Sequence, residues 1–118
     1  RAYFAAVVNK NVGITFDMQE VTTAVSDMNL TSTMVPVQNF AEGFDTVRVV
    51  ASERTKLSVN ATLHYHVGSE YTGKIAYIYA LSEDAGSFEL YRTCTVNEIG
   101  NVAIKTDNFT DVMILIAE

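Results

Sequence analysis

The sequence has few of the residues that most often cross-link a fold or form a reactive centre. It contains one cysteine, Cys94, so no disulfide can form within the chain. It has no tryptophan and a single proline, Pro36. No apolar run approaches the roughly 18 residues that a membrane-spanning helix requires. The sequence therefore predicts neither a disulfide framework nor insertion into a membrane.

Positive charge is also scarce. Lysine and arginine total 8 against 14 aspartates and glutamates, which gives a net charge of −6. Nucleic acids and polybasic membrane anchors both require a basic surface, so neither is an expected partner. The 118 residues, 48% hydrophobic and 19% charged, fit one globular domain. Because the chain begins at Arg1, we interpret residues 1–118 as one module cut from a longer protein.

Catalytic motifs are missing as well. There is no G-x-S-x-G, no glycine-rich phosphate loop and no H-E-x-x-H. Cys94 lies in the strand-like segment FELYRTCTV, where a small buried core residue is more typical than a nucleophile. A domain this small leaves little room for the deep cleft that paired catalytic carboxylates need. We therefore expect a protein that is not an enzyme.

The dominant pattern in the sequence is an alternation of apolar and polar residues, with a period of two. In residues 57–67 apolar and polar side chains alternate, which predicts a strand with one buried and one solvated face. Residues 75–81 are apolar on both faces, which predicts a central strand with Tyr77 and Tyr79 in the core beside Ile75 and Leu81. In the next strand the alternation predicts inward side chains at Phe88, Leu90, Cys94 and Val96.

Further short runs rich in β-branched residues fill the rest of the chain. They lie at residues 2–9, 12–18, 45–52, 101–107 and 109–117, with a strand and turn expected in 20–30. Glycine- and asparagine-rich turns separate them, and Pro36 suits an edge strand or loop. The pattern predicts an all-β fold, an antiparallel β-sandwich of about eight to nine strands.

Metal ligation is one candidate chemistry. His64 and His66 project from the same side of their strand, a spacing that suits zinc if Glu89 or Glu98 supplies a third ligand. Two solvated histidines are the plainer interpretation. Acidic residues also cluster in turns, without an EF-hand pattern, and calcium takes such oxygen ligands. These acidic clusters are Asp17 with Glu20, Glu83 with Asp84, and Asp107 with Asp111. We expect no cofactor, with bound calcium as the alternative.

Sugar binding is the other candidate. Sugar rings stack on exposed aromatic side chains while nearby polar groups fix their hydroxyls. Tyr91 faces outward by parity, and Tyr71 lies in a turn. A groove bearing Tyr91, His64, His66 and Lys74 would suit a soluble glycan chain, whereas the lack of tryptophan disfavours a flat crystalline ligand. The predicted ligand-binding residues are Tyr91, His64, His66, Tyr71 and Lys74.

The second half of the chain carries a spaced motif. Residues 57–118 resemble a non-catalytic β-sandwich accessory module, similar to carbohydrate-binding modules, of secreted multimodular proteins of gut and rumen Firmicutes. In those modules His and Ser usually stand where this chain has Asn108 and Thr110. The matching positions are Gly73, Lys74, Ala76 and Tyr79 of G-K-x-A-x-x-Y, then Gly100, Val102 and Thr106, then Asp107-Asn108-Phe109-Thr110-Asp111.

The resemblance implies a function but no particular site residues. Such modules are extracellular or on the cell surface, beside enzymes, dockerins or cell-wall anchors, in cellulosomal and other secreted proteins. The expected function is to bind plant polysaccharide and so target an attached enzyme or cell surface, with cell-wall glycan and neighbouring modules as partners. The alternative is a structural or interaction module, such as a spacer or an X-type domain next to a dockerin. That alternative predicts an exposed apolar patch or sheet edge.

Overall fold

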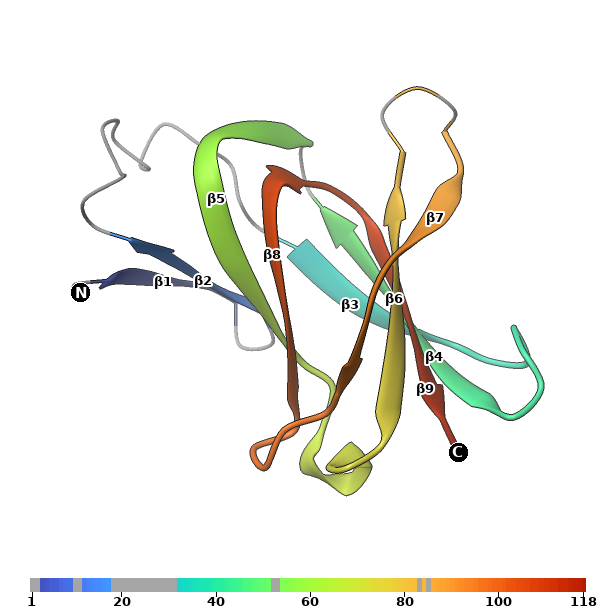
Figure 1. Cartoon of the computed structure of the whole chain (residues 1–118). Coiled ribbons are helices and arrows are strands. Elements are labelled where there is room, and N and C mark those ends of the chain that lie inside the picture. Colours follow the sequence, from blue (N-terminus) through green and yellow to red (C-terminus); the bar gives the residue numbers. More distant parts are fainter. Residues whose placement is uncertain (1–2, 10–11, 18–31, 52–53, 83, 85) are drawn as a thin grey trace.

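The computed structural model is built almost entirely of β-strands, as Figure 1 shows. It describes residues 3–9, 12–17, 32–51, 54–82, 84 and 86–118, so the strand and turn expected at 20–30 lie outside the described residues. One short 3₁₀ turn, η2 (Ser69–Tyr71), joins the fifth and sixth strands. The strands are β1 (Tyr3–Asn9), β2 (Val12–Asp17), β3 (Ser32–Val37), β4 (Phe44–Ala51), β5 (Thr55–His66), β6 (Ile75–Leu81), β7 (Phe88–Thr95), β8 (Asn101–Phe109) and β9 (Val112–Ala117).

The strands form two antiparallel sheets, which confirms the predicted β-sandwich. The four-stranded sheet has the order β1-β2-β5-β8, and the five-stranded sheet has the order β3-β4-β9-β6-β7. Every described strand pair is antiparallel. Pro36 lies in β3, an edge strand, where its missing N–H removes no ladder hydrogen bond from a second neighbour. Within the described residues, no helix has the length and apolarity to cross a lipid bilayer.

The core forms where the inner faces of the two sheets meet. In β5 the alternation holds as predicted, because Leu63 and Tyr65 are fully buried while His64 and His66 face outward. Strands β8 and β9 contribute alternate residues in the same way. The buried core cluster comprises Val12, Ile14, Val49, Leu57, Ala61, Leu63, Tyr65, Ala76, Ile78, Val96, Val102, Ile104, Phe109, Val112, Ile114 and Ile116.

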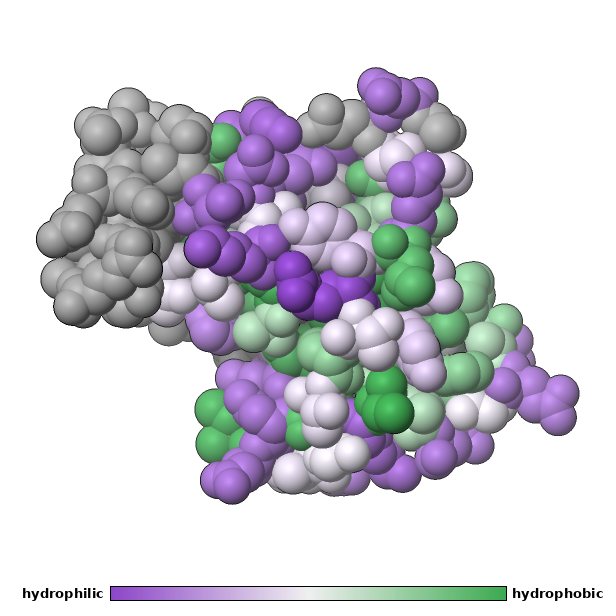
Figure 2. All heavy atoms as spheres, in the orientation of Figure 1, coloured by the Kyte–Doolittle hydropathy of each residue, from purple (hydrophilic) through white to green (hydrophobic). Residues whose placement is uncertain are grey.

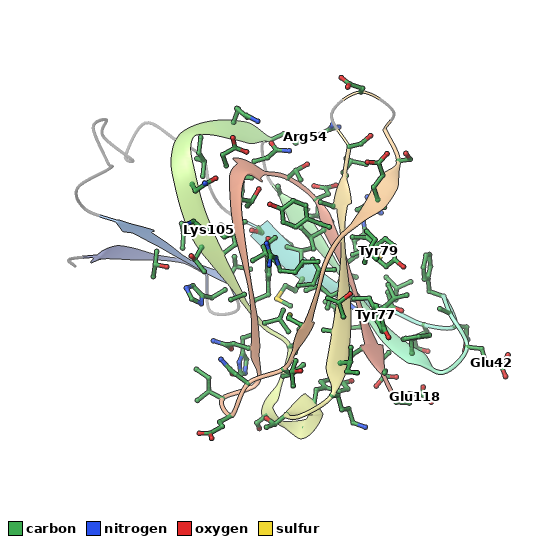
Figure 3. All side chains as sticks on the ribbon, viewed as in Figure 1. Glu42, Arg54, Tyr77, Tyr79, Lys105 and Glu118 are labelled. Atoms are coloured by element: carbon green, nitrogen blue, oxygen red, sulfur yellow. The ribbon has the colours of Figure 1, made fainter. Side chains whose placement is uncertain are left out.

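The face of β6 that points into the core is the opposite of the face that the sequence predicted. Ala76 and Ile78 are fully buried, opposite Ile116 and Ile114 of β9, whereas Ile75 is 45% exposed. Tyr77 and Tyr79 are only half-buried and point away from the four-stranded sheet (Figure 3). The prediction that they fill the core is wrong. Both faces of this strand are apolar, so the period of two left its orientation open, and the smaller face packs inside.

A β-bulge in β7 explains a second error. Ile78 pairs with Arg92, but the next residue, Tyr79, pairs with Leu90, so β7 holds one extra residue at Tyr91. A bulge reverses the alternation beyond it. Cys94 therefore packs against the core as predicted, while Phe88 and Leu90 turn outward, and Leu90 is 55% exposed.

The two outer faces of the sandwich differ in polarity. The outer side of the four-stranded sheet carries Thr62, His64, His66, Asn101 and Lys105. The outer side of the five-stranded sheet is mostly apolar, and Figure 2 shows hydrophobic residues gathered over β4, β9 and β6. We call this surface the apolar face; it comprises Val35, Val37, Phe44, Ile75, Tyr77, Tyr79, Leu81, Phe88, Leu90, Met113 and Leu115.

Candidate functional site

A crevice of about 380 Å³ opens between the two sheets where β7 diverges from β8. Its floor is made by inward-facing residues of both sheets, Ala80, Ile104 and Val112. Its volume lies within the range of small-molecule sites, which run from roughly 300 to 1,000 Å³. Tyr91, predicted from sequence as a ligand-binding residue, forms part of the wall.

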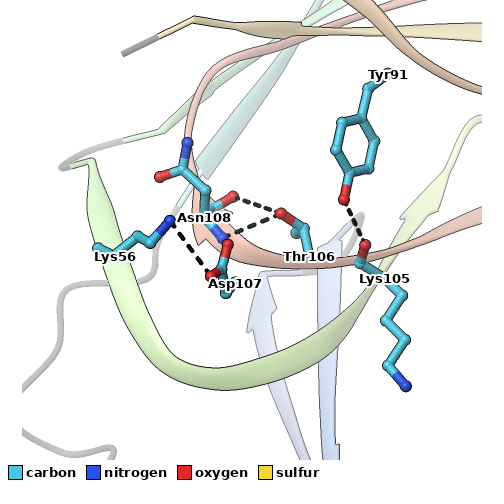
Figure 4. A network of polar contacts seen from close by, with 6 residues as sticks. All are labelled: Lys56, Tyr91, Lys105, Thr106, Asp107 and Asn108. Atoms are coloured by element: carbon cyan, nitrogen blue, oxygen red, sulfur yellow. Dashed lines mark hydrogen bonds and ion pairs between the residues drawn. The ribbon is translucent and has the colours of Figure 1, made fainter.

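Tyr91 owes its position to the β7 bulge. Its hydroxyl donates a hydrogen bond of 2.7 Å to the main-chain carbonyl of Lys105 on β8, so the side chain bridges the edges of the two sheets (Figure 4). The ring remains 44% exposed, and the Arg92 guanidinium lies 6.0 Å from its centroid. The result is an aromatic ring that is fixed in orientation yet accessible to a ligand.

Polar side chains stand opposite this ring along β5 and β8. Lys56 forms an ion pair of 3.3 Å with Asp107, and both line the crevice with Asn108 (Figure 4). The Thr106 hydroxyl accepts a 3.0 Å hydrogen bond from the main-chain N–H of Asn108, which fixes the turn of β8 at this point. Glu89 lines the crevice from the β7 side. Carboxylate, ammonium and amide groups thus lie around an aromatic ring, which is the chemistry that hydroxyl-rich ligands require.

A buried hydroxyl adds a further polar group. Thr110 lines the crevice and is 3% exposed, and its Oγ1 has no hydrogen-bond partner in the described part of the chain. An unsatisfied buried hydroxyl costs roughly 1–3 kcal/mol relative to a hydrogen-bonded one.

The two histidines lie on a different surface. Both project from β5 on the outer side of the four-stranded sheet, as the sequence predicted. His64 Nε2 is 3.0 Å from the Thr15 hydroxyl, and His66 Nδ1 is 2.7 Å from the Asn101 side-chain oxygen. These hydrogen bonds orient the rings among polar side chains, and neither ring lines the crevice.

No metal centre forms around them in the described residues. Among those residues, no three His, Cys, Asp or Glu side chains converge in a way that could hold a metal ion. Glu89 lines the crevice and Glu98 lies in the β7–β8 turn. Of the acidic clusters, Glu83 and Glu20 lie outside the described residues, and Asp107 and Asp111 are engaged with Lys56 and Arg48.

Tyr71 lies in a second concavity, of about 790 Å³, beneath the β3–β4 hairpin. Its hydroxyl donates a 2.7 Å hydrogen bond to Asp45 Oδ2. That bond, followed by partial burial and the charges of nearby carboxylates, raises the pKa of Tyr71 to about 12. The two concavities share no residue, so Tyr71 and Tyr91 belong to separate surfaces. Lys74 follows η2 and lines neither of them.

Sequence reasoning thus found one wall of the crevice and missed the rest. Four of the other lining residues come from three separate segments: Lys56 from β5, Glu89 from β7, and Asp107 with Thr110 from the end of β8 and the turn after it. The β5 bend that brings Lys56 to β8 carries no clear sequence signal. The register shifts between Lys56 and Ala61, where β5 holds extra residues opposite β8. Asp107, Asn108 and Thr110 of the closing motif line the crevice.

Comparison of the chain with models of protein families, with curated proteins and with solved structures finds no match in any of the three. The function is therefore argued from the residues of the crevice and from the surfaces around it.

Proposed function

We propose that the protein is a non-catalytic, extracellular module that binds a glycan of the plant cell wall in the crevice beside Tyr91. The observation that carries the proposal is the fixed, accessible ring of Tyr91 opposite Lys56, Asp107 and Asn108. A sugar presents an apolar face to such a ring and hydroxyls to such polar groups. The resemblance of residues 57–118 to secreted accessory modules supports plant polysaccharide as the ligand and an attached enzyme or cell surface as the cargo.

The polar groups distinguish the crevice from the apolar face as a sugar site. Tyr77 and Tyr79 also present aromatic rings, and Phe44 contacts Tyr77 edge to face at 5.8 Å. Of the residues paired with these two tyrosines in β7 and β9, however, only Thr93 carries a hydrogen-bonding side chain. A sugar site needs hydrogen-bonding groups next to its aromatic rings, and at the crevice Lys56, Asp107 and Asn108 supply them beside Tyr91.

The test is a binding screen with soluble xyloglucan, mannan, xylan and cellulose oligosaccharides, followed by two variants at Tyr91. Tyr91→Ala removes the ring and should raise the dissociation constant at least about tenfold, which corresponds to roughly 1.4 kcal/mol. Tyr91→Phe keeps the ring and should retain most of the affinity.

Tyr77→Ala on the apolar face is the matched control and should leave binding unchanged. Thermal unfolding of each variant separates loss of binding from loss of fold. Unchanged affinity in Tyr91→Ala would remove the crevice as the sugar site, and a screen without any bound glycan would overturn the proposed function.

A second candidate function is supported by the apolar face itself. Val35 and Ile75 are each 45% exposed and Leu90 is 55% exposed, on three strands of one sheet. Contiguous apolar surface of this kind typically marks an interface. We propose, as the alternative, that the apolar face packs against a neighbouring module of the same polypeptide, in a structural role.

Hydrogen exchange tests this alternative. In a longer chain that includes an adjoining module, the outer residues of β6 and β7 should gain protection relative to the isolated module. Ile75→Lys should abolish that gain. Ile99→Lys, at a 65% exposed residue in the β7–β8 turn, should not. Equal exchange in the short and long chains would contradict the structural role.

A further inference from the structure

Carboxylates outnumber cations around the crevice. One lysine, Lys56, lines it together with three carboxylates, those of Asp84, Glu89 and Asp107, so the described lining carries a net charge of −2. Lys56 is ion-paired with Asp107 at 3.3 Å, and its charge is therefore offset before any ligand arrives. The excess negative charge of the lining comes from Asp84 and Glu89.

These two carboxylates reach the crevice from the same side as Tyr91. Glu89 pairs with Ala80 beside the β7 bulge, and Asp84 belongs to the β6–β7 hairpin. Both side chains are exposed, and neither forms an ion pair within the described part of the chain. Arg92 does not reverse the balance: its guanidinium lies 6.0 Å from the centroid of the Tyr91 ring and does not line the crevice, and counting it still leaves carboxylates in excess.

From this charge distribution we infer that the crevice selects neutral glycans and rejects glycan chains that carry uronic acids. The inference rests on the proposed function and names the class of its ligand. A sugar carboxylate beside Tyr91 meets the like charges of Glu89 and Asp84, whereas a sugar hydroxyl in the same place can donate a hydrogen bond to either. Two like charges about 7 Å apart in water repel enough to raise a dissociation constant roughly threefold. The net charge of −6 on the whole chain adds to this repulsion at low salt concentration.

Isothermal titration with two derivatives of one oligosaccharide tests the inference. The parent is the neutral oligosaccharide that binds best in the screen, and the derivatives carry, at equal substitution, either carboxymethyl or hydroxyethyl groups, which are similar in size but differ in charge. At about 10 mM salt the dissociation constant of the carboxymethyl derivative should be at least about fivefold higher than that of the hydroxyethyl derivative. Near 1 M salt, where the Debye length is about 3 Å, the two constants should converge.

The outcomes separate this inference from the proposed function. Equal behaviour of the two derivatives at low salt, including equal loss of binding, would overturn the inference while leaving binding of the parent oligosaccharide intact. A difference that stays the same at every salt concentration would overturn it as well, because repulsion between charges is screened by salt. Absence of binding by the parent and by every other glycan of the screen would overturn the proposed function itself.

Glu89→Gln provides an independent test in the same assay. The substitution removes one charge at nearly constant shape, so the ratio of the two dissociation constants at low salt should fall roughly twofold to threefold. Glu98→Gln is the matched control, because it removes the same charge from the β7–β8 turn, at the opposite end of β7. Its ratio should equal that of the parent protein, and thermal unfolding checks the fold of both variants. An unchanged ratio in Glu89→Gln, or an equal fall in both variants, would show that the charges of the lining do not select the ligand.

Discussion

The Cα of Gly100 lies directly against the main chain of Gly68. A Cβ built on Gly100 would fall 2.3 Å from the Gly68 carbonyl carbon, and the Gly100 carbonyl accepts hydrogen bonds from the N–H groups of Val67 and Gly68. Gly100 also has a φ of +81°, in the left-handed region that glycine adopts most readily. This contact ties the turn after β5 to the turn before β8.

Gly100→Ala should therefore be strongly destabilising. We expect a loss of about 3 kcal/mol or more in the free energy of unfolding, because the methyl group meets main-chain atoms that cannot rotate away. Gly73→Ala is the control: its φ is +85°, but a Cβ there meets nothing within 4 Å, so only about 1–2 kcal/mol should be lost. Denaturant unfolding measures both values, and equal losses would show that the Gly68 contact is unimportant.

Tyr65→Phe should leave stability unchanged or raise it by about 1 kcal/mol. Tyr65 is 1% exposed, and its hydroxyl has no hydrogen-bond partner in the described part of the chain. Burial raises the pKa of this phenol, which stays protonated in the folded protein. Removing a buried, unpaired hydroxyl abolishes the free-energy cost of desolvating it and breaks no hydrogen bond. A clear loss in thermal unfolding temperature would indicate a buried partner, such as an ordered water.

Tyr71 should make the protein sensitive to alkali. Its hydrogen bond to Asp45 raises the pKa from 10.0 to about 12, so between these values the unfolded chain releases a proton that the folded chain keeps. Because the unfolded state binds fewer protons in this range, a rise in pH favours it. The free energy of unfolding should therefore fall as the pH rises from about 10 to about 12. Below that window the stabilising contribution is fully present.

Tyr71→Phe should remove this part of the pH dependence. Unfolding curves recorded across the alkaline range, together with the ultraviolet absorbance of the phenolate, provide the measurement. If the variant loses stability over the same window by the same amount as the parent, other tyrosines are responsible.

Asp107, near the end of β8, and Asp111, in the turn between β8 and β9, should differ sharply in their contribution to stability. The Asp111 carboxylate is 15% exposed, accepts a 2.9 Å hydrogen bond from the Ala51 main-chain N–H and lies 3.7 Å from Arg48. Asp111→Ala leaves that N–H without its acceptor and should cost about 1–3 kcal/mol. Asp107→Ala breaks only the exposed pair with Lys56 and should cost less than about 1 kcal/mol. Similar losses in denaturant unfolding would contradict this ranking.

The fold was predictable because alternation is informative wherever one face of a strand is polar. In β5 the polar positions at His64 and His66 left a single way to place Leu63 and Tyr65, and the structure follows it. In β6 both faces are apolar, so alternation could not decide between Ala76 and Tyr77 as the buried residue. In β7 the extra residue at Tyr91 reverses the alternation, and no turn residue in the sequence marks this bulge.

The candidate site was less predictable than the fold for a related reason. Tyr91 was predicted because it is aromatic and strict alternation places it outward; in the structure the β7 bulge turns its side chain toward β8 instead. The crevice beside it depends on the β7 bulge and on the shifted register between Lys56 and Ala61, both of which are tertiary features. Sequence spacing alone could not bring Lys56 and Thr110 to the same wall.

The order of strands in the five-stranded sheet has a consequence for biosynthesis. Strand β9 is made after the other described strands, yet it lies between β4 and β6 at the centre of its sheet. Until Val112–Ala117 leaves the ribosome, the two halves of that sheet have no strand to join them, and their inner residues stay open to chaperones and proteases. Cooperative folding of this module must therefore wait until β9 has left the ribosome, and nascent chains halted before residue 112 should leave the module unfolded.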